Sequence, residues 1–312
     1  MSVTSIARDP GRAASSGVIG SEADVTPIVL AAMAGAPDAR LREIMAALVK
    51  HLHAFAREVR LTEGEWEIGV DRLNRIGQAT HEAHNEGVLM SDALGLSTLV
   101  CLLNNGQNGA TETAAALLGP FWRMNPPATP NGGTILRSNT PGPALFAQCR
   151  IADPQGRPLA GVEVDVWQSS PVGLYENQDP TQADMNLRGK FTTDADGRFF
   201  FRSVKPAGYP VPTDGPVGDL LRAQRRHPYR PAHLHVLAYK PGFKTLVTQV
   251  FVDDDEHLES DVVFGVTRAL IGDFRRHEGD APEPDVGDPW YSLDYSFVME
   301  PGEAKLPVPP IK

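Results

Sequence analysis

The sequence predicts an α+β protein in which a helical N-terminal domain precedes an all-β sandwich. Three observations support this fold class. Apolar residues recur at helical spacing between residues 38 and 118, and short runs broken by Pro, Gly and Asp fill the rest of the chain. A length of 312 residues also accommodates two domains. We therefore expect a helical domain over residues 1–118 and a β-sandwich domain over residues 119–312.

The helical part has recognisable helix starts. Asp38 is of the type that caps a helix N-terminus, and Thr62 with Glu65 forms a capping box in "TEGEWEIGVDRLNRIG". Ser91 is expected to cap a further helix, "SDALGLSTLVCLLNN". Residues 1–35 are rich in Gly, Ala and Ser, so we expect them to be partly disordered or to wrap a neighbour.

Six runs in the second half predict strands: "ALFAQCRI", "GVEVDVWQ", "KFTTDADGRFFFRSV", "HLHVLAYK", "TLVTQVFV" and "LDYSFVM". In "VEVDVW" the three valines fall on one face and Glu163, Asp165 and Trp167 on the other, which is typical of a half-buried strand. "DADG" at 194–197 predicts a hairpin turn between two strands. This spacing of turns favours a sandwich or a barrel.

Composition excludes several classes of function. A formal charge of -10 argues against nucleic acid and anionic membranes as partners. No apolar run approaches the roughly 20 residues that span a bilayer, and the N-terminus lacks the apolar core of a signal peptide, so we expect a cytoplasmic protein. Cys101 and Cys149 lack CxxC spacing and supply neither a disulfide framework nor a thiolate metal cage.

The tripeptide His-Leu-His occurs twice, and local structure separates the two copies. His51 and His53 lie in a helical pattern, where residues i and i+2 point about 200° apart and cannot close on one ion. His233 and His235 lie in a predicted strand, where alternate side chains share a face. The second pair is therefore a candidate metal site.

Two tyrosines in Pro- and Gly-rich loops extend this candidate site. Tyr175 stands in "WQSSPVGLYENQD" and Tyr209 in "VKPAGYPVPTDGPVG". No carboxylate stands at facial-triad spacing beside "HLH", and a phenolate is a hard anion suited to ferric iron. The spacing leaves three alternatives open: loop tyrosines that only pack on the sandwich, a zinc hydrolase with the same ligands, and a non-catalytic binding module.

Together these stretches resemble the intradiol ring-cleaving dioxygenases, non-haem ferric enzymes that split catechols between their two hydroxyls. The resemblance includes "LLGPFW", "LRGKFTTDADGRFFFRSVKPAGYPVPTDGPVG", "HPYRPAHLHV" and "TQVFVDDD", and covers most of the chain. It implies a catalytic sandwich that carries mononuclear Fe(III), with Tyr175, Tyr209, His233 and His235 as ligands. It also implies that Tyr209 and His235 are axial, that Tyr209 is catalytic because the substrate displaces it, and that the N-terminal helices form a homodimer.

The resemblance further implies a substrate pocket made of Leu89, Asp92, Gly119, Pro120, Phe121, Val211, Pro212, Arg230, Gln249 and Val263. Arg230 is implied to be catalytic, with its guanidinium directed at negative charge that develops on the substrate. A structural salt bridge is the alternative role of Arg230, and sheet packing is the alternative role of Gln249.

Asp92 decides the expected substrate. This part of the pocket is apolar in catechol-specific relatives, whereas an aspartate resembles the hydroxyquinol-cleaving members, where it accepts a hydrogen bond from a third ring hydroxyl. The expected reaction in aromatic catabolism is cleavage of benzene-1,2,4-triol by O2 to 3-hydroxy-cis,cis-muconate or maleylacetate. The alternatives are a catechol or chlorocatechol substrate, and an Asp92 that only starts the helix at Ser91.

Overall fold

The computed structural model describes residues 17–82, 84–105 and 112–309. The chain divides into two compact units, residues 1–72 and residues 73–312. The domain boundary expected between residues 118 and 119 stays a prediction. The helices of the described chain are α1 (Glu22–Met33), α2 (Ala39–Glu58), α3 (Glu63–Ala79), α4 (Glu86–Ala93), α5 (Leu96–Asn105), α6 (Pro216–Ala223) and the short 3₁₀ helix η1 (Arg268–Leu270).

Two predicted helix starts are confirmed. The Asp38 carboxylate accepts hydrogen bonds from the backbone N–H groups of Arg40 and Leu41, at 2.8 and 3.0 Å, and so caps α2. At the start of α3, the backbone N–H of Thr62 donates to Glu65 at 2.9 Å and the backbone N–H of Glu65 donates to the Thr62 hydroxyl at 3.3 Å. These reciprocal bonds form the capping box that the sequence predicts.

Part of the N-terminal segment is helical, and the expectation of partial disorder or of wrapping a neighbour stays a prediction. Residues 22–33 form α1, while residues 1–16 lie outside the described residues. Glu22 accepts a hydrogen bond from Arg57 of α2 at 2.7 Å, and Thr26 contacts His53 of α2 at 2.9 Å. Packing against α2 stabilises a helix that composition alone does not indicate.

The prediction of a helix that starts at Ser91 is wrong. Gly95 adopts a φ of +72°, which favours glycine, and it separates α4 from α5. Ser91 lies inside α4, and Asn85 caps that helix by accepting a hydrogen bond from the Val88 N–H at 2.9 Å. Asp92 therefore lies near the end of a helix and does not start one.

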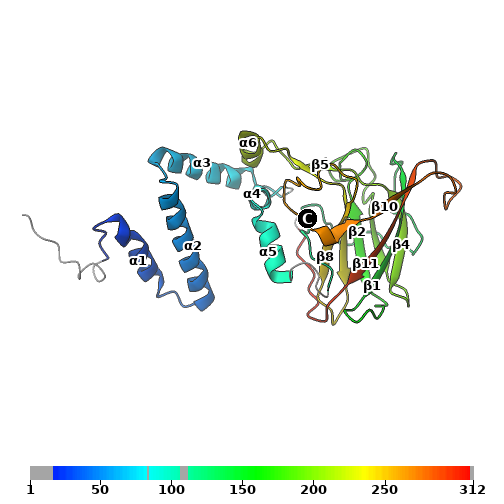
Figure 1. The fold of residues 1–312 in the computed structure, drawn as a ribbon, viewed down its shortest axis with the longest axis horizontal. Coiled ribbons are helices and arrows are strands. Elements are labelled where there is room, and N and C mark those ends of the chain that lie inside the picture. The colour runs from blue at the N-terminus through cyan, green and yellow to red at the C-terminus, as the bar shows by residue number, and fades with distance from the viewer. Residues whose placement is uncertain (1–16, 83, 106–111, 310–312) are drawn as a thin grey trace, which may run out of the picture. The chain divides into compact units, whose positions relative to one another are not determined.

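The strands build two sheets that face each other (Figure 1). The first has the order β10-β11-β1-β4, with β1 at Ala144–Ala152, β4 at Arg198–Val204, β10 at Phe274–His277 and β11 at Trp290–Val298. The second has the order β3-β2-β7-β8-β9, with β2 at Glu163–Gln168, β3 at Arg188–Thr192, β7 at His233–Tyr239, β8 at Leu246–Val252 and β9 at Ile271–Gly272. Strands β5 (Tyr209–Pro210) and β6 (Tyr229–Arg230) form a separate pair. Each of the six predicted runs carries a strand, which confirms the sandwich.

The main apolar core lies between the two sheets. Val164 and Val166 of β2 and Leu234 and Val236 of β7 belong to this core. The opposite face of β2 is not solvated, contrary to the half-buried pattern, because Trp167 on that face is 1% exposed. Loops cover this second face of the five-stranded sheet, and the face therefore can hold a buried site.

The "DADG" turn does not close a hairpin. Gly197 has a φ of +72° and donates its N–H to Asp194 at 3.0 Å, so a tight turn is present. However, β3 pairs with β2 and β4 pairs with β1, so the turn carries the chain from one sheet to the other. Which strand pairs with which depends on long-range packing, and the residues of the turn do not determine it.

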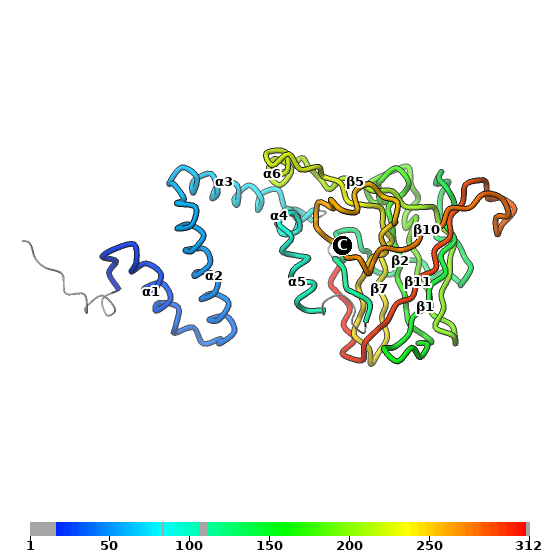
Figure 2. The backbone as a smooth tube through the Cα atoms, viewed as in Figure 1, coloured from blue at the N-terminus to red at the C-terminus, as the bar shows by residue number. Residues whose placement is uncertain are grey.

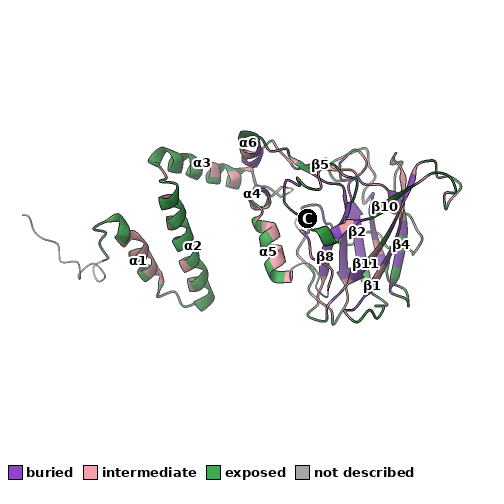
Figure 3. Ribbon diagram, in the orientation of Figure 1, coloured by how far each residue is buried: buried purple, intermediate pink, exposed green. Residues whose placement is uncertain are grey.

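Burial is concentrated in the strands, whereas α2 and α3 are largely exposed (Figure 3). Among the described residues, no single helix is long and apolar enough to cross a membrane. The pair α4 and α5 meets the length and apolarity test only jointly, with a bend of 79° at the break between them.

A buried carboxylate connects α4 to α6. Glu86 is 1% exposed and accepts a hydrogen bond at 2.8 Å from the backbone N–H of Val217, in the first turn of α6. Its second oxygen contacts Nε2 of His84. A Cβ at Gly215 would stand 2.4 Å from a carboxylate oxygen of Glu86, so a larger residue there would displace this carboxylate.

Replacing Glu86 should therefore destabilise the fold. Glu86→Ala leaves the N–H of Val217 buried without its acceptor, and we expect the free energy of unfolding to fall by about 1–3 kcal/mol. Urea denaturation measures this change. Glu43→Ala is the control, because Glu43 pairs with Arg40 on the surface and should change stability by about 0.5 kcal/mol or less. Equal stability of the two variants would contradict the role assigned to Glu86.

Candidate metal centre and substrate pocket

His233 and His235 share the covered face of the five-stranded sheet. Both side chains are 1% exposed, and their Nε2 atoms lie 3.1 Å apart. The ring of Trp167, on the neighbouring strand β2, stacks on His235 with centroids 4.6 Å apart. Burial lowers the pKa of His233 to about 3 and the pKa of His235 well below its ordinary value. Both imidazoles are therefore neutral near pH 7 and can act as metal ligands.

The backbone selects the tautomer of His233. Its Nδ1 lies 2.7 Å from the carbonyl oxygen of Pro231. A carbonyl oxygen only accepts, so Nδ1 carries the proton and Nε2 presents a lone pair toward His235. A first-row metal ion binds imidazole nitrogens at about 2.1 Å, so two nitrogens 3.1 Å apart can share one ion.

Tyr175 and Tyr209 lie against the two histidines. Their rings meet edge to face with centroids 5.5 Å apart, and Tyr209 lies 5.6 Å from His233 and Tyr175 6.4 Å from His235. The Tyr175 hydroxyl is buried and makes no hydrogen bond within the described part of the chain. Burial, and then the neighbouring Tyr209, raise the pKa of Tyr175 well above its ordinary value. A buried polar atom without a partner is costly, and a metal ion would satisfy it.

These four residues fit a ferric ion by their chemistry. No group of three or more His, Cys, Asp and Glu side chains in the described ranges could hold a metal. Two neutral imidazoles therefore need phenolates to complete a donor set, and hard phenolates favour ferric iron over zinc. The earlier His-Leu-His copy offers no such set, because His51 and His53 lie on helix α2.

Arg230 lies beside this donor set and is itself buried. Its Nη2 donates to Gln249 at 3.0 Å and its Nη1 lies 3.4 Å from Nε2 of His233. Two further bonds, both 3.2 Å, go from Nε and Nη2 to the carboxylate of Asp261. Burial opposes the charge on Arg230, but Asp261 and Tyr209 outweigh it and raise the pKa of the guanidinium. Arg230 thus makes a structural salt bridge, which was one of the two roles considered from the sequence. Its guanidinium also faces the candidate metal ligand His233.

Asp261 is a residue that sequence analysis missed. Its two oxygens accept from the N–H groups of Val263 and Gly265, at 3.3 and 2.9 Å, as well as from Arg230. Burial raises the pKa of this carboxyl, but the Arg230 charge and these hydrogen bonds lower it overall. The pairing joins positions 31 residues apart, and no local pattern in "LESDVVFG" indicates it.

Gln249 connects several parts of the candidate centre. Its side-chain oxygen accepts from Arg230, and its nitrogen donates at 2.7 Å to the carbonyl of Leu117. The same nitrogen lies 3.4 Å from Nδ1 of His235, which is the partner of Gln249 across strands β7 and β8. Gln249 is fully buried in the sheet and also orients Arg230, and its place in the substrate pocket stays a prediction.

The predicted pocket residues gather in two places. Leu89, Val211 and Val263 pack in one apolar cluster. This cluster joins α4, α6, the loop after β5 and the segment that precedes η1. Figure 2 labels β5, α6 and β7, and in the sequence β6 lies between α6 and β7. Arg226 braces this cluster by donating to the carbonyls of Ala93 and Val262, at 2.7 and 2.8 Å.

The second group lies against the aromatic donors. Phe121 stacks on Tyr175 with centroids 4.4 Å apart. Gly119 has a φ of +73°, and a Cβ there would stand 3.1 Å from the His235 ring, so glycine permits this close approach. Pro120 is exposed and Pro212 is half-buried.

Asp92 lies within electrostatic range of Arg230 and Asp261. Burial raises its pKa, while a hydrogen bond with Ser97 and the charge of Arg230 partly offset this effect. The hydroxyls of Ser97 and Ser91 lie 2.8 Å apart, so Ser97 can accept from Ser91 while it donates to Asp92. Asp92 is thus a half-buried carboxylate that feels the charge of Arg230, and its place in the substrate pocket stays a prediction.

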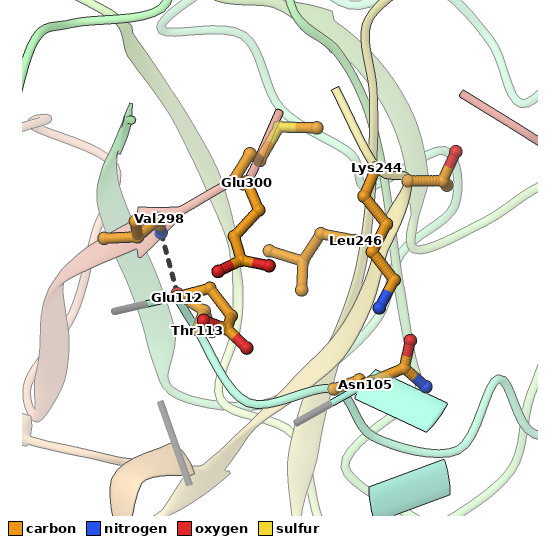
Figure 4. A pocket seen from close by; sticks show the side chains of 10 residues that line it. Asn105, Glu112, Thr113, Lys244, Leu246, Val298 and Glu300 are labelled. Atoms are coloured by element: carbon orange, nitrogen blue, oxygen red, sulfur yellow. Dashed lines mark hydrogen bonds between the residues drawn. The ribbon is translucent and has the colours of Figure 1, made fainter. Parts of the chain in front are cut away.

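A separate shallow hollow lies elsewhere on the second unit (Figure 4). Its lining includes Lys244, Leu246, Val298 and Glu300. None of the predicted site residues lines it, so this hollow is not part of the candidate centre.

Two family models match the chain. "Catechol dioxygenase N terminus" matches residues 38–112, and "Dioxygenase" matches residues 118–301, more than half of the sequence. The chain belongs to the intradiol ring-cleavage dioxygenases. This family is iron-dependent, in agreement with the donor set described above. Membership also sets aside the hypotheses of a binding module and a zinc hydrolase.

Several relatives of this intradiol dioxygenase are named after their substrates. Hydroxyquinol 1,2-dioxygenase of Rhizobium sp. (strain MTP-10005) is 44% identical over 87% of this chain and 92% of its own length. Catechol 1,2-dioxygenase of Candida albicans is 40% identical over 83% of this chain and 86% of its own. The solved structure of hydroxyquinol 1,2-dioxygenase from Pseudomonas putida DLL-E4 matches with a TM-score of 0.83 and 40% identity, over 90% of this chain and 99% of that one.

Asp261 should matter for turnover in this dioxygenase. Asp261→Asn keeps the shape of the side chain but removes the charge that holds Arg230, so we expect kcat/KM to fall roughly tenfold or more while iron content is retained. Steady-state kinetics and metal analysis measure the two quantities. Asp254→Asn, at an exposed pair with Lys205, should change neither. Loss of iron or of folding in Asp261→Asn would instead show that Asp261 only supports the fold.

Proposed function

We propose that this intradiol dioxygenase holds Fe(III) through Tyr175, Tyr209, His233 and His235. The observation that supports the proposal is the convergence of four buried rings, with two imidazole Nε2 atoms 3.1 Å apart and a Tyr175 hydroxyl that lacks a protein partner within the described residues. When bound, ferric iron would stabilise the deprotonated diol and draw electron density from its ring, which lets a ring carbon react with O2.

The chain's own groups have distinct roles in this proposal. As a phenolate, Tyr209 Oη would take up a proton from the incoming diol and become a neutral phenol; its ring lies 5.6 Å from that of His233. Arg230 directs a guanidinium already fixed by Asp261 and Gln249 at negative charge on the substrate, without reorganisation during the reaction. The apolar cluster around Leu89 and Val263 excludes water.

The proposed substrate is hydroxyquinol, benzene-1,2,4-triol. Cleavage between the 1,2-hydroxyls incorporates both atoms of O2 and gives 3-hydroxy-cis,cis-muconate, or its keto form maleylacetate. Asp92 supports this substrate, since a half-buried carboxylate near Arg230 can accept a hydrogen bond from the third hydroxyl. The names of the Rhizobium and Pseudomonas relatives agree with it.

Cleavage of catechol or chlorocatechol to a cis,cis-muconate is the second candidate. The Candida albicans relative favours it, because its identity of 40% is close to that of the hydroxyquinol enzymes. The two candidates differ in what Asp92 meets. Catechol has no third hydroxyl, and it would leave this carboxylate without a partner from the substrate.

The proposal includes two domains: a helical domain of residues 1–118 and a catalytic domain of residues 119–312. We further propose that the protein is cytoplasmic and forms a homodimer through helices of the first domain. Supporting the dimer, α2 and α3 expose many large apolar side chains. These are Leu41, Ile44, Leu48, Leu52, Phe55, Trp66, Ile68, Val70 and Leu73.

Colour should report the metal ligands. Iron-loaded protein should show a red-brown phenolate-to-iron charge-transfer band, and Tyr175→Phe should lower both the band and the iron content, because a phenolate donor is lost. Visible spectra and metal analysis test this. Tyr239→Phe is the matched control, since Tyr239 is a half-buried tyrosine at the other end of β7 and should change neither quantity. A colourless wild-type protein that is fully loaded with zinc would refute the ferric site.

Substrate preference tests the hydroxyquinol proposal. Wild-type kcat/KM should favour benzene-1,2,4-triol over catechol, and Asp92→Ala should reduce this preference by about 1–3 kcal/mol, because one buried hydrogen-bond partner is lost. Asp71→Ala, which removes an exposed helical carboxylate, should leave the ratio unchanged. A wild-type preference for catechol would contradict the proposal, and an unchanged ratio in Asp92→Ala would show that Asp92 does not read the substrate.

A further inference from the structure

A second buried arginine adjoins the donor set and has no role in the function described so far. Arg188, at the start of β3, is 1% exposed, and its Nε donates to Glu176 at 2.7 Å. Glu176 directly follows Tyr175 and is also buried. Arg123 donates to the same oxygen of Glu176 at 2.8 Å and to Asp184 at 2.8 Å. Two arginines thus hold one buried carboxylate beside an iron ligand.

Arg188 touches both the Tyr175 ring and a pocket segment. Its guanidinium carbon lies 5.9 Å from the ring centroid of Tyr175, within the range of cation–π attraction. Its Nη1 donates at 2.6 Å to the carbonyl oxygen of Phe121, whose ring stacks on Tyr175. One side chain therefore contacts a proposed ligand and fixes the backbone of residues 119–121, which the resemblance places in the substrate pocket.

Stability alone does not account for this arrangement. Replacing a buried ion pair by apolar residues of similar volume is often neutral or stabilising, because both charges lose hydration. Here Nη2 of Arg188 and Oε2 of Glu176 make no hydrogen bond to any described residue, so the pair is not optimised for the fold. Its position against Tyr175 and Phe121 indicates a role in the site instead.

We propose that Arg188 is a positioning residue that tunes the Tyr175 phenolate through its charge and places the pocket segment through Phe121, with Glu176 as the opposing charge. This inference rests on the proposed ferric site. In a buried, low-dielectric setting, a nearby cation lowers the energy of the phenolate electrons and a nearby anion raises it. Arg188 and Glu176 therefore act on the same ligand in opposite directions.

Opposite charges predict opposite spectral shifts. Arg188→Met removes the cation and leaves Glu176 beside the ligand, so the phenolate-to-iron band should move to longer wavelength. Glu176→Gln removes the anion and keeps Arg188, so the band should move to shorter wavelength. Visible spectra of both iron-loaded variants, with iron content measured in parallel, give the readout independently of turnover.

Arg188→Lys separates charge from positioning. Lysine keeps the cation but lacks the planar fork that reaches both Glu176 and the Phe121 carbonyl. We expect its band to stay close to that of wild type while KM rises roughly tenfold and kcat changes less, since the pocket segment loses a hydrogen bond to a charged donor.

Arg202→Met is the matched control. Arg202 is partly buried, pairs with Glu283 and Asp285, and lies 6.0 Å from the ring of Phe146, which is not a proposed ligand. The same substitution there should leave the band and KM unchanged.

The outcomes separate this inference from the ferric site itself. A colourless wild type would refute the site. A coloured wild type whose band does not move in Glu176→Gln would overturn the inference even if Arg188→Met failed to fold. Shifts of the same sign in Glu176→Gln and Arg188→Met would also overturn it, because they would reflect general loosening of the site.

Discussion

The alternation of side chains along β7 is the constraint on which the site depends. Leu234 and Val236 point into the core between the sheets, so His233 and His235 must point to the other face. The proposed metal site requires this face to be buried. The covering segments are loops that carry Tyr175 and Phe121 and the short strand β5, which carries Tyr209. The strand that stabilises the sandwich therefore also sets the direction of both histidines, with little freedom for either to turn away.

Buried charges surround the four rings in compensated pairs. Arg230 with Asp261 lies on one side and Arg188 with Glu176 on another. Each arginine has one carboxylate partner and at least one further contact inside the site, to Gln249 or to the Phe121 carbonyl. Pairing offsets the cost of burial and leaves the guanidinium groups in fixed orientations, which is what preorganised electrostatic stabilisation requires.

The wall of the proposed substrate pocket is assembled from segments distant in the sequence. Helix α4 meets α6 through Glu86, and Arg226 holds the end of α4 to the segment that contains Val262. Asp92 has its position because of these contacts, since the Gly95 break ends α4 just beyond it. A residue that would read a third substrate hydroxyl is thus positioned by hydrogen bonds that involve neither substrate nor metal.

The sequence alone determined the helix caps at Asp38 and Thr62, the strand runs and the contrast between the two His-Leu-His copies, because these depend on periodicity and on local hydrogen bonding. The sequence was also sufficient to identify the family, because the family's motifs include the residues of the candidate site. Tertiary structure alone decided the break at Gly95, the crossing of the 194–197 turn between sheets, and the partners of Arg230, Arg188 and Glu86, which lie 31, 12 and 131 residues away. A local pattern reports which face a side chain takes on its own element. Which distant charge meets that face depends on how the elements pack, since a buried ion pair is specified by packing and desolvation rather than by neighbours in the chain.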